Sequence, residues 1–132
     1  MKLEFDREKT KLFYENYEVC NCVYCRNFRK VISSSYSELV HFLEQFGIIT
    51  GKPVEAFDYS WADDTKSKRL SQSIYSVYSS IDSEFEHELT QEIILHFLKS
   101  DKLFDTGMAK PYFLIEVNNL KLEWQLEEKL RD

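Results

Sequence analysis

The stretch PYFLIEVNNLKLEWQL, residues 111–126, decides the fold class. It predicts two strands joined at Asn118 and Asn119, because asparagine side chains tolerate turn geometry. Two earlier stretches, VEAFDYSW (54–61) and SIYSVYSSI (73–81), are rich in β-branched and aromatic residues. Such residues favour strands, so a sheet is expected in the C-terminal half.

The interval DSEFEHELTQEIILHFLKSD, residues 82–101, carries two conflicting signals. Ser83 and Glu86 have the spacing of a helical capping box. Phe85, His87 and Leu89 instead alternate with acidic residues, which is typical of a strand. We predict a strand.

The N-terminal third predicts helices. Residues 6–18 form the first, with Asp6 as its N-cap, after a short strand at 1–5. Residues 23–32 form an amphipathic second helix. The third spans 35–47, where Ser35 and Glu38 make a capping box and Gly47 ends the helix. The expected apolar stripe of the first helix consists of Leu12, Phe13 and Tyr17.

Helices followed by strands predict an α+β fold, in which N-terminal helices pack on one face of an antiparallel sheet. We expect one globular domain over residues 1–132, mainly helical at 1–48 and mainly strands at 54–128. No alternation of strand and helix supports a Rossmann or thioredoxin-type parallel sheet.

The charge is unevenly distributed. The chain of 132 residues has a net charge of −6, while residues 34–132 carry ten Lys and Arg against eighteen Asp and Glu, a net of −8. Such a body repels phosphate backbones, so nucleic-acid binding is not expected and a basic protein partner is favoured. The N-terminus lacks a signal-peptide pattern and no apolar run is long enough for a membrane span, so we expect a cytoplasmic protein that does not bind membranes.

Cys20, Cys22 and Cys25 form the cluster CNCVYC. A zinc site would use all three with a fourth ligand that the sequence does not identify. A redox pair would use Cys22 and Cys25, with Arg26 or Arg29 favouring the Cys22 thiolate. Burial as small apolar side chains is the third interpretation. The sequence leaves these alternatives open.

An acidic stretch is the second candidate site. If the interval is a strand, its acids line one face and could receive a basic partner, or could simply protect a solvated edge strand. These residues are Asp82, Glu84, Glu86 and Glu88.

The sequence contains no catalytic motif such as G-x-S-x-G, H-E-x-x-H or a Walker loop. Its histidines are isolated from any nucleophile, so no catalytic residue is assigned and we expect a non-enzymatic protein. The first expectation is a protein-binding module, in the manner of an immunity protein against a basic toxin, that needs no cofactor. A zinc-binding domain and a thiol redox protein are the alternatives.

Nearly the whole chain resembles a family of small uncharacterised bacterial proteins of about 130 residues. The resemblance lies in the cysteine cluster within FDREKTKLFYENYEVCNCVYCRNF, in ELVHFLEQFGI followed by KP, and in the closing KPYFLIEVNNLKLEW. It implies a cytoplasmic domain, and no activity or catalytic residue comes with it.

Overall fold

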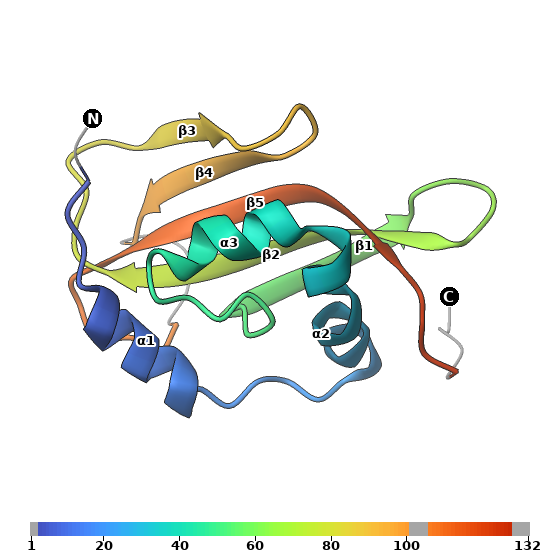
Figure 1. Cartoon of the computed structure of the whole chain (residues 1–132), viewed down its shortest axis with the longest axis horizontal. Helices are drawn as coiled ribbons and strands as arrows, with labels where there is room; N and C mark the ends of the chain where they lie inside the picture. The colour runs from blue at the N-terminus through green and yellow to red at the C-terminus, as the bar shows by residue number, and fades with distance from the viewer. Residues whose placement is uncertain (1–2, 101–105, 128–132) are drawn as a thin grey trace.

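The computed structural model describes residues 3–100 and 106–127. Within these residues, three helices precede five strands (Figure 1). The helices are α1 (Arg7–Asn16), α2 (Val23–Ser35) and α3 (Ser37–Glu44). The strands are β1 (Glu55–Trp61), β2 (Lys68–Tyr78), β3 (Phe85–Glu88), β4 (Ile94–Lys99) and β5 (Tyr112–Glu123).

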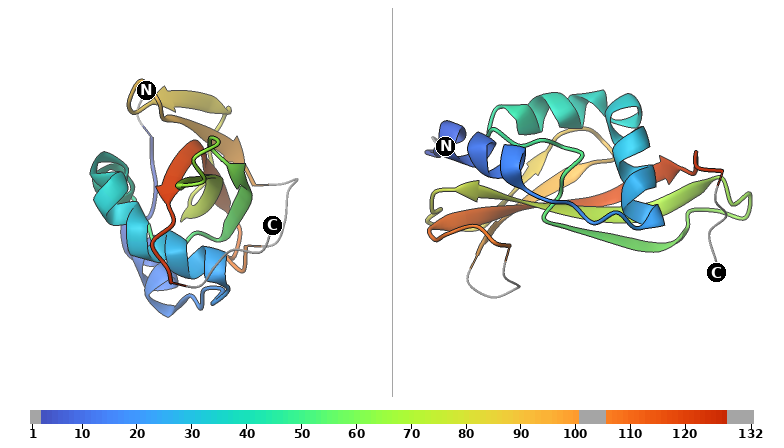
Figure 2. Two further views of the ribbon diagram at one scale, coloured as in Figure 1. Left: turned by 90° about the vertical axis from the view of Figure 1, so that its right-hand side faces the viewer. Right: turned by 90° about the horizontal axis from the view of Figure 1, so that it is seen from below.

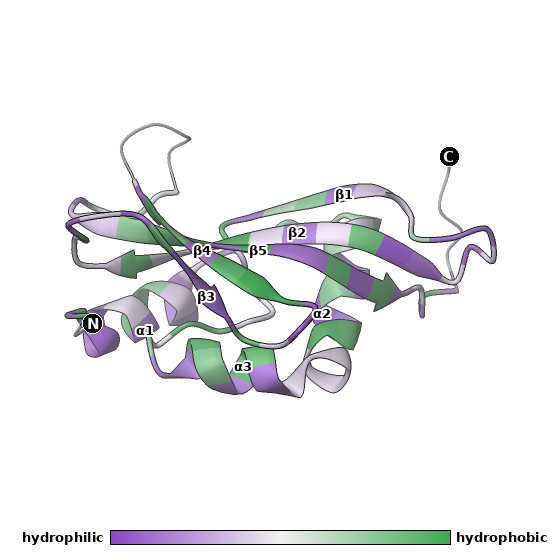
Figure 3. Ribbon diagram, turned by 90° about the horizontal axis from the view of Figure 1, so that it is seen from above, coloured by the Kyte–Doolittle hydropathy of each residue, from purple (hydrophilic) through white to green (hydrophobic). Residues whose placement is uncertain are grey.

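The strands form one antiparallel sheet in the order β1-β2-β5-β4-β3. The two longest strands, β2 and β5, pair at its centre, and the helices lie together on one face (Figures 2 and 3). This confirms the expected α+β fold. No helix among the described residues is long and apolar enough to cross a bilayer.

The core lies between the helices and the central strands. Leu39 and Leu43 of α3 are fully buried, as is Phe113 of β5. The Phe97 ring of β4 lies 6.0 Å from the rings of both Phe46 and Phe113, a separation typical of aromatic pairs in cores. Replacing Leu39 or Leu43 by alanine would lower the free energy of unfolding by roughly 2–5 kcal/mol.

Helix α1 covers the part of the β2 edge that β1 leaves unpaired. Asp6 caps the helix as predicted, since its carboxylate accepts a hydrogen bond from the Lys9 N–H. The Tyr14 hydroxyl accepts from the Ser76 N–H at 2.8 Å and donates to the Ser76 carbonyl at 3.0 Å. The Thr10 hydroxyl accepts a hydrogen bond from the Tyr78 N–H at 3.0 Å. Sealing this edge removes a template for unwanted strand pairing.

Three local predictions in the helical region are wrong in whole or in part. In the predicted stripe of α1, Leu12 is 61% exposed, whereas Phe13 and Tyr17 are partly buried and pack against the core as expected. The fully buried residues of α1 are Thr10 and Tyr14, which also bind β2 through hydrogen bonds. No strand forms in the described part of residues 1–5. Ser35 is the last residue of α2 and Tyr36 is the N-cap of α3 without a side-chain cap, so the expected capping box is absent.

The double asparagine is a bulge within one continuous strand, which corrects the two strands predicted around it. In the pairing of β2 with β5, Ser71 lies opposite Leu120 and Ser73 lies opposite Val117, so two β5 residues face one β2 residue. Asn119 has a φ of 62°, the left-handed conformation that asparagine tolerates. The extra residue shifts the alternation of side chains by one position, so Leu120 packs on the same face as Val117.

The interval 82–101 contains two short strands rather than one. β3 and β4 pair antiparallel, with Phe85 opposite Phe97 and Glu88 opposite Ile94. The strand prediction is therefore confirmed for residues 85–88 and 94–99, while Asp101 lies outside the described residues. Gly47, at a φ of 87°, takes the helix-ending conformation that the sequence predicted.

Candidate functional site

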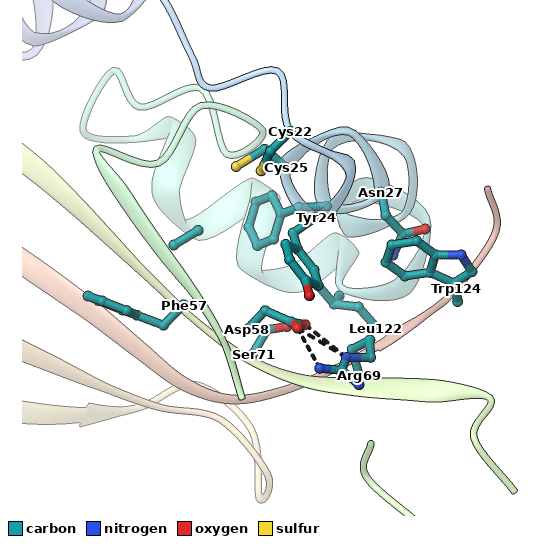
Figure 4. A pocket seen from close by; sticks show the side chains of 12 residues that line it. Cys22, Tyr24, Cys25, Asn27, Phe57, Asp58, Arg69, Ser71, Leu122 and Trp124 are labelled. Atoms are coloured by element: carbon teal, nitrogen blue, oxygen red, sulfur yellow. Dashed lines mark hydrogen bonds and ion pairs between the residues drawn. The ribbon is translucent and has the colours of Figure 1, made fainter. Parts of the chain in front are cut away.

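The cysteine cluster lies beside a pocket of about 220 Å³ between the start of α2, strand β1 and the C-terminal end of β5 (Figure 4). Cys22 and Cys25 lie at one end of this pocket, and Asp58 and Arg69 lie at the other. Aromatic side chains form much of the wall in between. These are Tyr24, Phe28 and Trp124. Phe57 also borders the pocket, but its ring points away from the other lining side chains (Figure 4).

Two bulges lie in the strands that border the pocket. Besides the β5 bulge, β1 shifts register between Asp58 and Ser60, opposite Ser71 of β2. Each bulge changes which side chains face the helices, and bulges frequently re-aim side chains beside functional sites. Asp58, Arg69 and Ser71 face the pocket through the ordinary alternation and pairing of β1 and β2. The β5 bulge adds Leu122, which lies opposite Arg69.

The three cysteines come together at the first turn of α2. Their Sγ atoms all lie within 4.8 Å of one another, with Cys20 and Cys22 exposed and Cys25 half-buried. Cys22 is the N-cap residue, and Cys25 follows three positions later, on the first turn of the helix. The third interpretation from the sequence, in which Cys25 and a neighbouring cysteine are only packed side chains, applies at most to Cys25.

Two arginines of α2 hold the loop that carries Cys20. Arg29 donates to the Cys20 carbonyl at 2.9 Å and to the Asn21 side chain at 3.1 Å. Arg26 donates to the Asn21 carbonyl at 3.2 Å. These bonds fold the loop back onto the helix, which brings the Cys20 sulfur to its two neighbours and places positive charge close to them.

The two thiols of the C-x-x-C pair have opposite pKa shifts. Burial raises the pKa of Cys22, but the backbone N–H groups of Cys25 and Tyr24 and the two other sulfurs outweigh it, so its pKa lies below the ordinary value. The N–H groups act as nearby dipoles, since Cys22 makes no side-chain capping hydrogen bond. Burial, followed by the adjacent Cys22 and Cys20 sulfurs, raises the pKa of Cys25 to about 12. Cys22 therefore ionises first.

A nearly buried ion pair forms the other end of the pocket. Arg69 Nη2 donates to Asp58 Oδ2 at 2.6 Å, and Arg69 Nε lies 3.1 Å from both carboxylate oxygens. The Arg69 guanidinium also lies 4.7 Å from the centre of the Trp61 ring. Sequence reasoning missed this pair, because only the register between β1 and β2 brings the two residues together.

Asn27 fixes the chain where it leaves β5. Its side-chain amide donates to the Glu123 carbonyl at 3.0 Å and accepts from the Gln125 N–H at 2.9 Å. Both capacities of the amide are used, so Asn27 positions the wall of the pocket. Trp124 lies between these two anchored residues, and its ring meets Tyr24 edge-on at 6.2 Å.

The acidic stretch lies at the opposite edge of the sheet. Glu86 and Glu88 belong to β3, whereas Asp82 and Glu84 precede it, and all four are exposed. Glu84 accepts a hydrogen bond from the Lys99 N–H, and Glu86 lies 3.5 Å from His96. The strand thus carries only half of the predicted acidic row.

The histidines do not join the cysteines. His87 of β3 stacks on Phe42 of α3 with ring centres 4.8 Å apart, and His96 lies on β4. Over residues 3–100 and 106–127, no carboxylate, imidazole or further thiol completes the group formed by the three cysteines. No family model, curated protein or solved structure matches the chain.

Proposed function

We propose that the protein binds a thiophilic metal ion, with Zn²⁺ as the first choice, through Cys20, Cys22 and Cys25. The mutual approach of the three Sγ atoms to within 4.8 Å carries this proposal. Zinc binds thiolates at about 2.3 Å, so sulfurs at three corners of its tetrahedron lie roughly 3.8 Å apart. Cys20 and Cys22 are exposed, so rotation of their side chains would bring the sulfurs towards that spacing.

The electrostatics of the cluster support thiolate ligands. Three thiolates and one Zn²⁺ carry a net charge of −1, which the N-terminal end of α2 and the adjacent Arg29 offset. Metal binding would also deprotonate Cys25, since a coordinated thiol is held as thiolate. The described residues supply three ligands, so the fourth position is open to solvent or to an added ligand, as in sites that act on a bound molecule.

Metal titration of the chain and of variants in which one cysteine is replaced tests the proposal. Under reducing conditions without chelator, the chain should bind one Zn²⁺, and Co²⁺ should give thiolate charge-transfer absorption. Cys22→Ser and Cys25→Ser should each weaken binding by at least about 100-fold, because each removes one of three ligands. His87→Gln and His96→Gln are the controls and should bind as the unmodified chain does. Less than half a zinc per chain, or unchanged affinity in Cys25→Ser, would contradict the proposal.

Thiol redox chemistry is the alternative use of this cluster. The opposite pKa shifts of Cys22 and Cys25 favour it, since one thiol would attack and the other would resolve. Oxidation of the metal-free chain by a small disulfide would then give a Cys22–Cys25 disulfide in a cycle that a dithiol reverses. If the chain does not catalyse the oxidation of a dithiol by the small disulfide, metal binding stands as the function.

Docking of a basic protein on the acidic edge is a second candidate. β3 is a four-residue edge strand whose two glutamates, like Asp82 and Glu84 before it, are exposed. A basic partner should be captured at low salt and released at high salt, and Asp82→Asn combined with Glu88→Gln should weaken capture. Capture that is insensitive to salt and to these substitutions would contradict this role.

A further inference from the structure

The pocket beside the cysteines has the size of a small ring. Its volume is about 220 Å³, compared with the roughly 150 Å³ of an apolar cavity that accepts benzene. Tyr24 and Trp124 present their aromatic rings along it. A planar ligand would replace water on these surfaces and stack against them.

The end of the pocket away from the cysteines offers hydrogen-bond acceptors. The Asp58 carboxylate has about four lone-pair directions, and its three contacts with Arg69 come from the side of the guanidinium. The Ser71 hydroxyl lines the pocket next to it. A ligand that carries an N–H group can therefore be held at this end.

The charge at that end selects a neutral ligand. Asp58 and Arg69 have side chains only 13% and 7% exposed and neutralise each other. A ligand with a net charge would have to be desolvated without a compensating partner, which costs several kcal/mol. Phosphates and carboxylates are disfavoured further, because the Asp58 carboxylate at this end would repel them.

At the cysteine end, a bound metal ion would need a fourth ligand atom. Cys22 and Cys25 border the pocket, so a metal ion held by the cluster would lie at this end of the cavity. An azole ring carries a basic nitrogen on one side and an N–H on the other, and a metal-bound imidazole commonly donates its second N–H to a carboxylate. We propose that the pocket binds a small neutral azole whose basic nitrogen completes the metal coordination and whose N–H is donated to Asp58 or Ser71. This inference rests on the proposed metal site.

Titration of the cobalt-loaded chain with imidazole tests the inference. Imidazole should change the visible Co²⁺ spectrum in a saturable way, and 1-methylimidazole, which lacks the N–H, should bind at least tenfold more weakly. Ser71→Leu fills the pocket and should weaken imidazole binding at least tenfold while one Co²⁺ per chain is retained. Ser60→Leu adds the same bulk at an exposed position of β1 and should leave binding unchanged. Ala56→Val, which fills the pocket from β1, replaces Ser71→Leu if that variant does not fold.

The outcomes separate the two proposals. A chain that binds Co²⁺ but does not respond to imidazole, or responds equally with Ser71→Leu or Ala56→Val, overturns the azole site and leaves the metal site standing. Equal binding of imidazole and 1-methylimidazole overturns the role of Asp58 and Ser71. A chain that takes up no Co²⁺ overturns both proposals.

Discussion

At the scale of single residues, Tyr14 shows how one polar side chain docks a helix on a sheet. It is completely buried, and its hydroxyl completes both backbone hydrogen bonds of Ser76 beyond the end of β1. Burial, in the first place, raises the pKa of Tyr14 well above its ordinary value, so it remains a neutral donor and acceptor. The docking of α1 therefore depends on an uncharged hydroxyl.

Replacing Tyr14 by phenylalanine should cost about 1–3 kcal/mol of unfolding free energy, because two buried backbone groups lose their partner while the ring volume stays. Urea unfolding measures the change. Tyr59→Phe is the matched control, since Tyr59 is 57% exposed and should change stability by less than about 0.5 kcal/mol. Equal stability of the two variants would show that the Tyr14 hydroxyl does not hold α1.

Two glycines at similar backbone angles should differ in their tolerance of alanine. Gly47 and Gly107 have φ values of 87° and 82°, so alanine costs about 1 kcal/mol at each through backbone strain. A Cβ at Gly47 would also lie 2.4 Å from the Arg7 carbonyl oxygen, whereas none of the described atoms lies within 4 Å at Gly107. Thermal or urea unfolding should therefore give about 2–4 kcal/mol for Gly47→Ala. Equal losses would contradict the close approach of α1.

The cysteines should differ in their alkylation by iodoacetamide in the metal-free chain. The pKa of Cys22 is lowered, so its thiolate should form at a lower pH than that of a free cysteine. Its alkylation rate should therefore rise at a lower pH as well. Cys25, with a pKa of about 12, should stay slow wherever the chain remains folded. Mass spectrometry of peptides, with a cysteine-containing peptide as reference, measures both rates. Identical pH profiles would contradict the geometry at the start of α2.

At the scale of elements, β5 shows what a sequence pattern can and cannot predict. Apolar residues on both sides of Asn118 and Asn119 indicated strands correctly, and tolerance of turn geometry suggested a reversal between them. A turn and a bulge use the same left-handed asparagine, and only pairing with β2 distinguishes them. The conflicting signals of residues 82–101 likewise depended on tertiary pairing, since β3 is four residues long.

Deleting Asn119 should destabilise the sheet far more than replacing it. Without the extra residue, Leu120 and Leu122 would point to the opposite face, away from α2, which should cost at least about 4 kcal/mol and prevent cooperative unfolding. Asn119→Gly keeps the bulge and the positive φ, so its stability should change by less than about 1 kcal/mol. Urea unfolding monitored by circular dichroism compares the two. A stable deletion variant would contradict the bulge.

At the scale of the whole molecule, the candidate site combines a part that the sequence predicts with a part that it cannot. The cysteines are neighbours in the chain, so their local spacing was enough to propose a metal site. The facing ion pair comes from β1 and β2, and Leu122 and Trp124 come from the end of the chain. These residues meet only through the sheet register and the β5 bulge, which no local pattern encodes.

In the proposed site, three cysteine sulfurs of one chain hold a metal ion. X-ray absorption spectroscopy of the zinc-loaded protein tests it most directly, because it counts the sulfur atoms bound to zinc and measures their distance. We predict three sulfurs at about 2.3 Å and one nitrogen or oxygen at about 2.0–2.1 Å. A first shell of nitrogen and oxygen alone, or of four sulfurs shared between chains, would contradict the account.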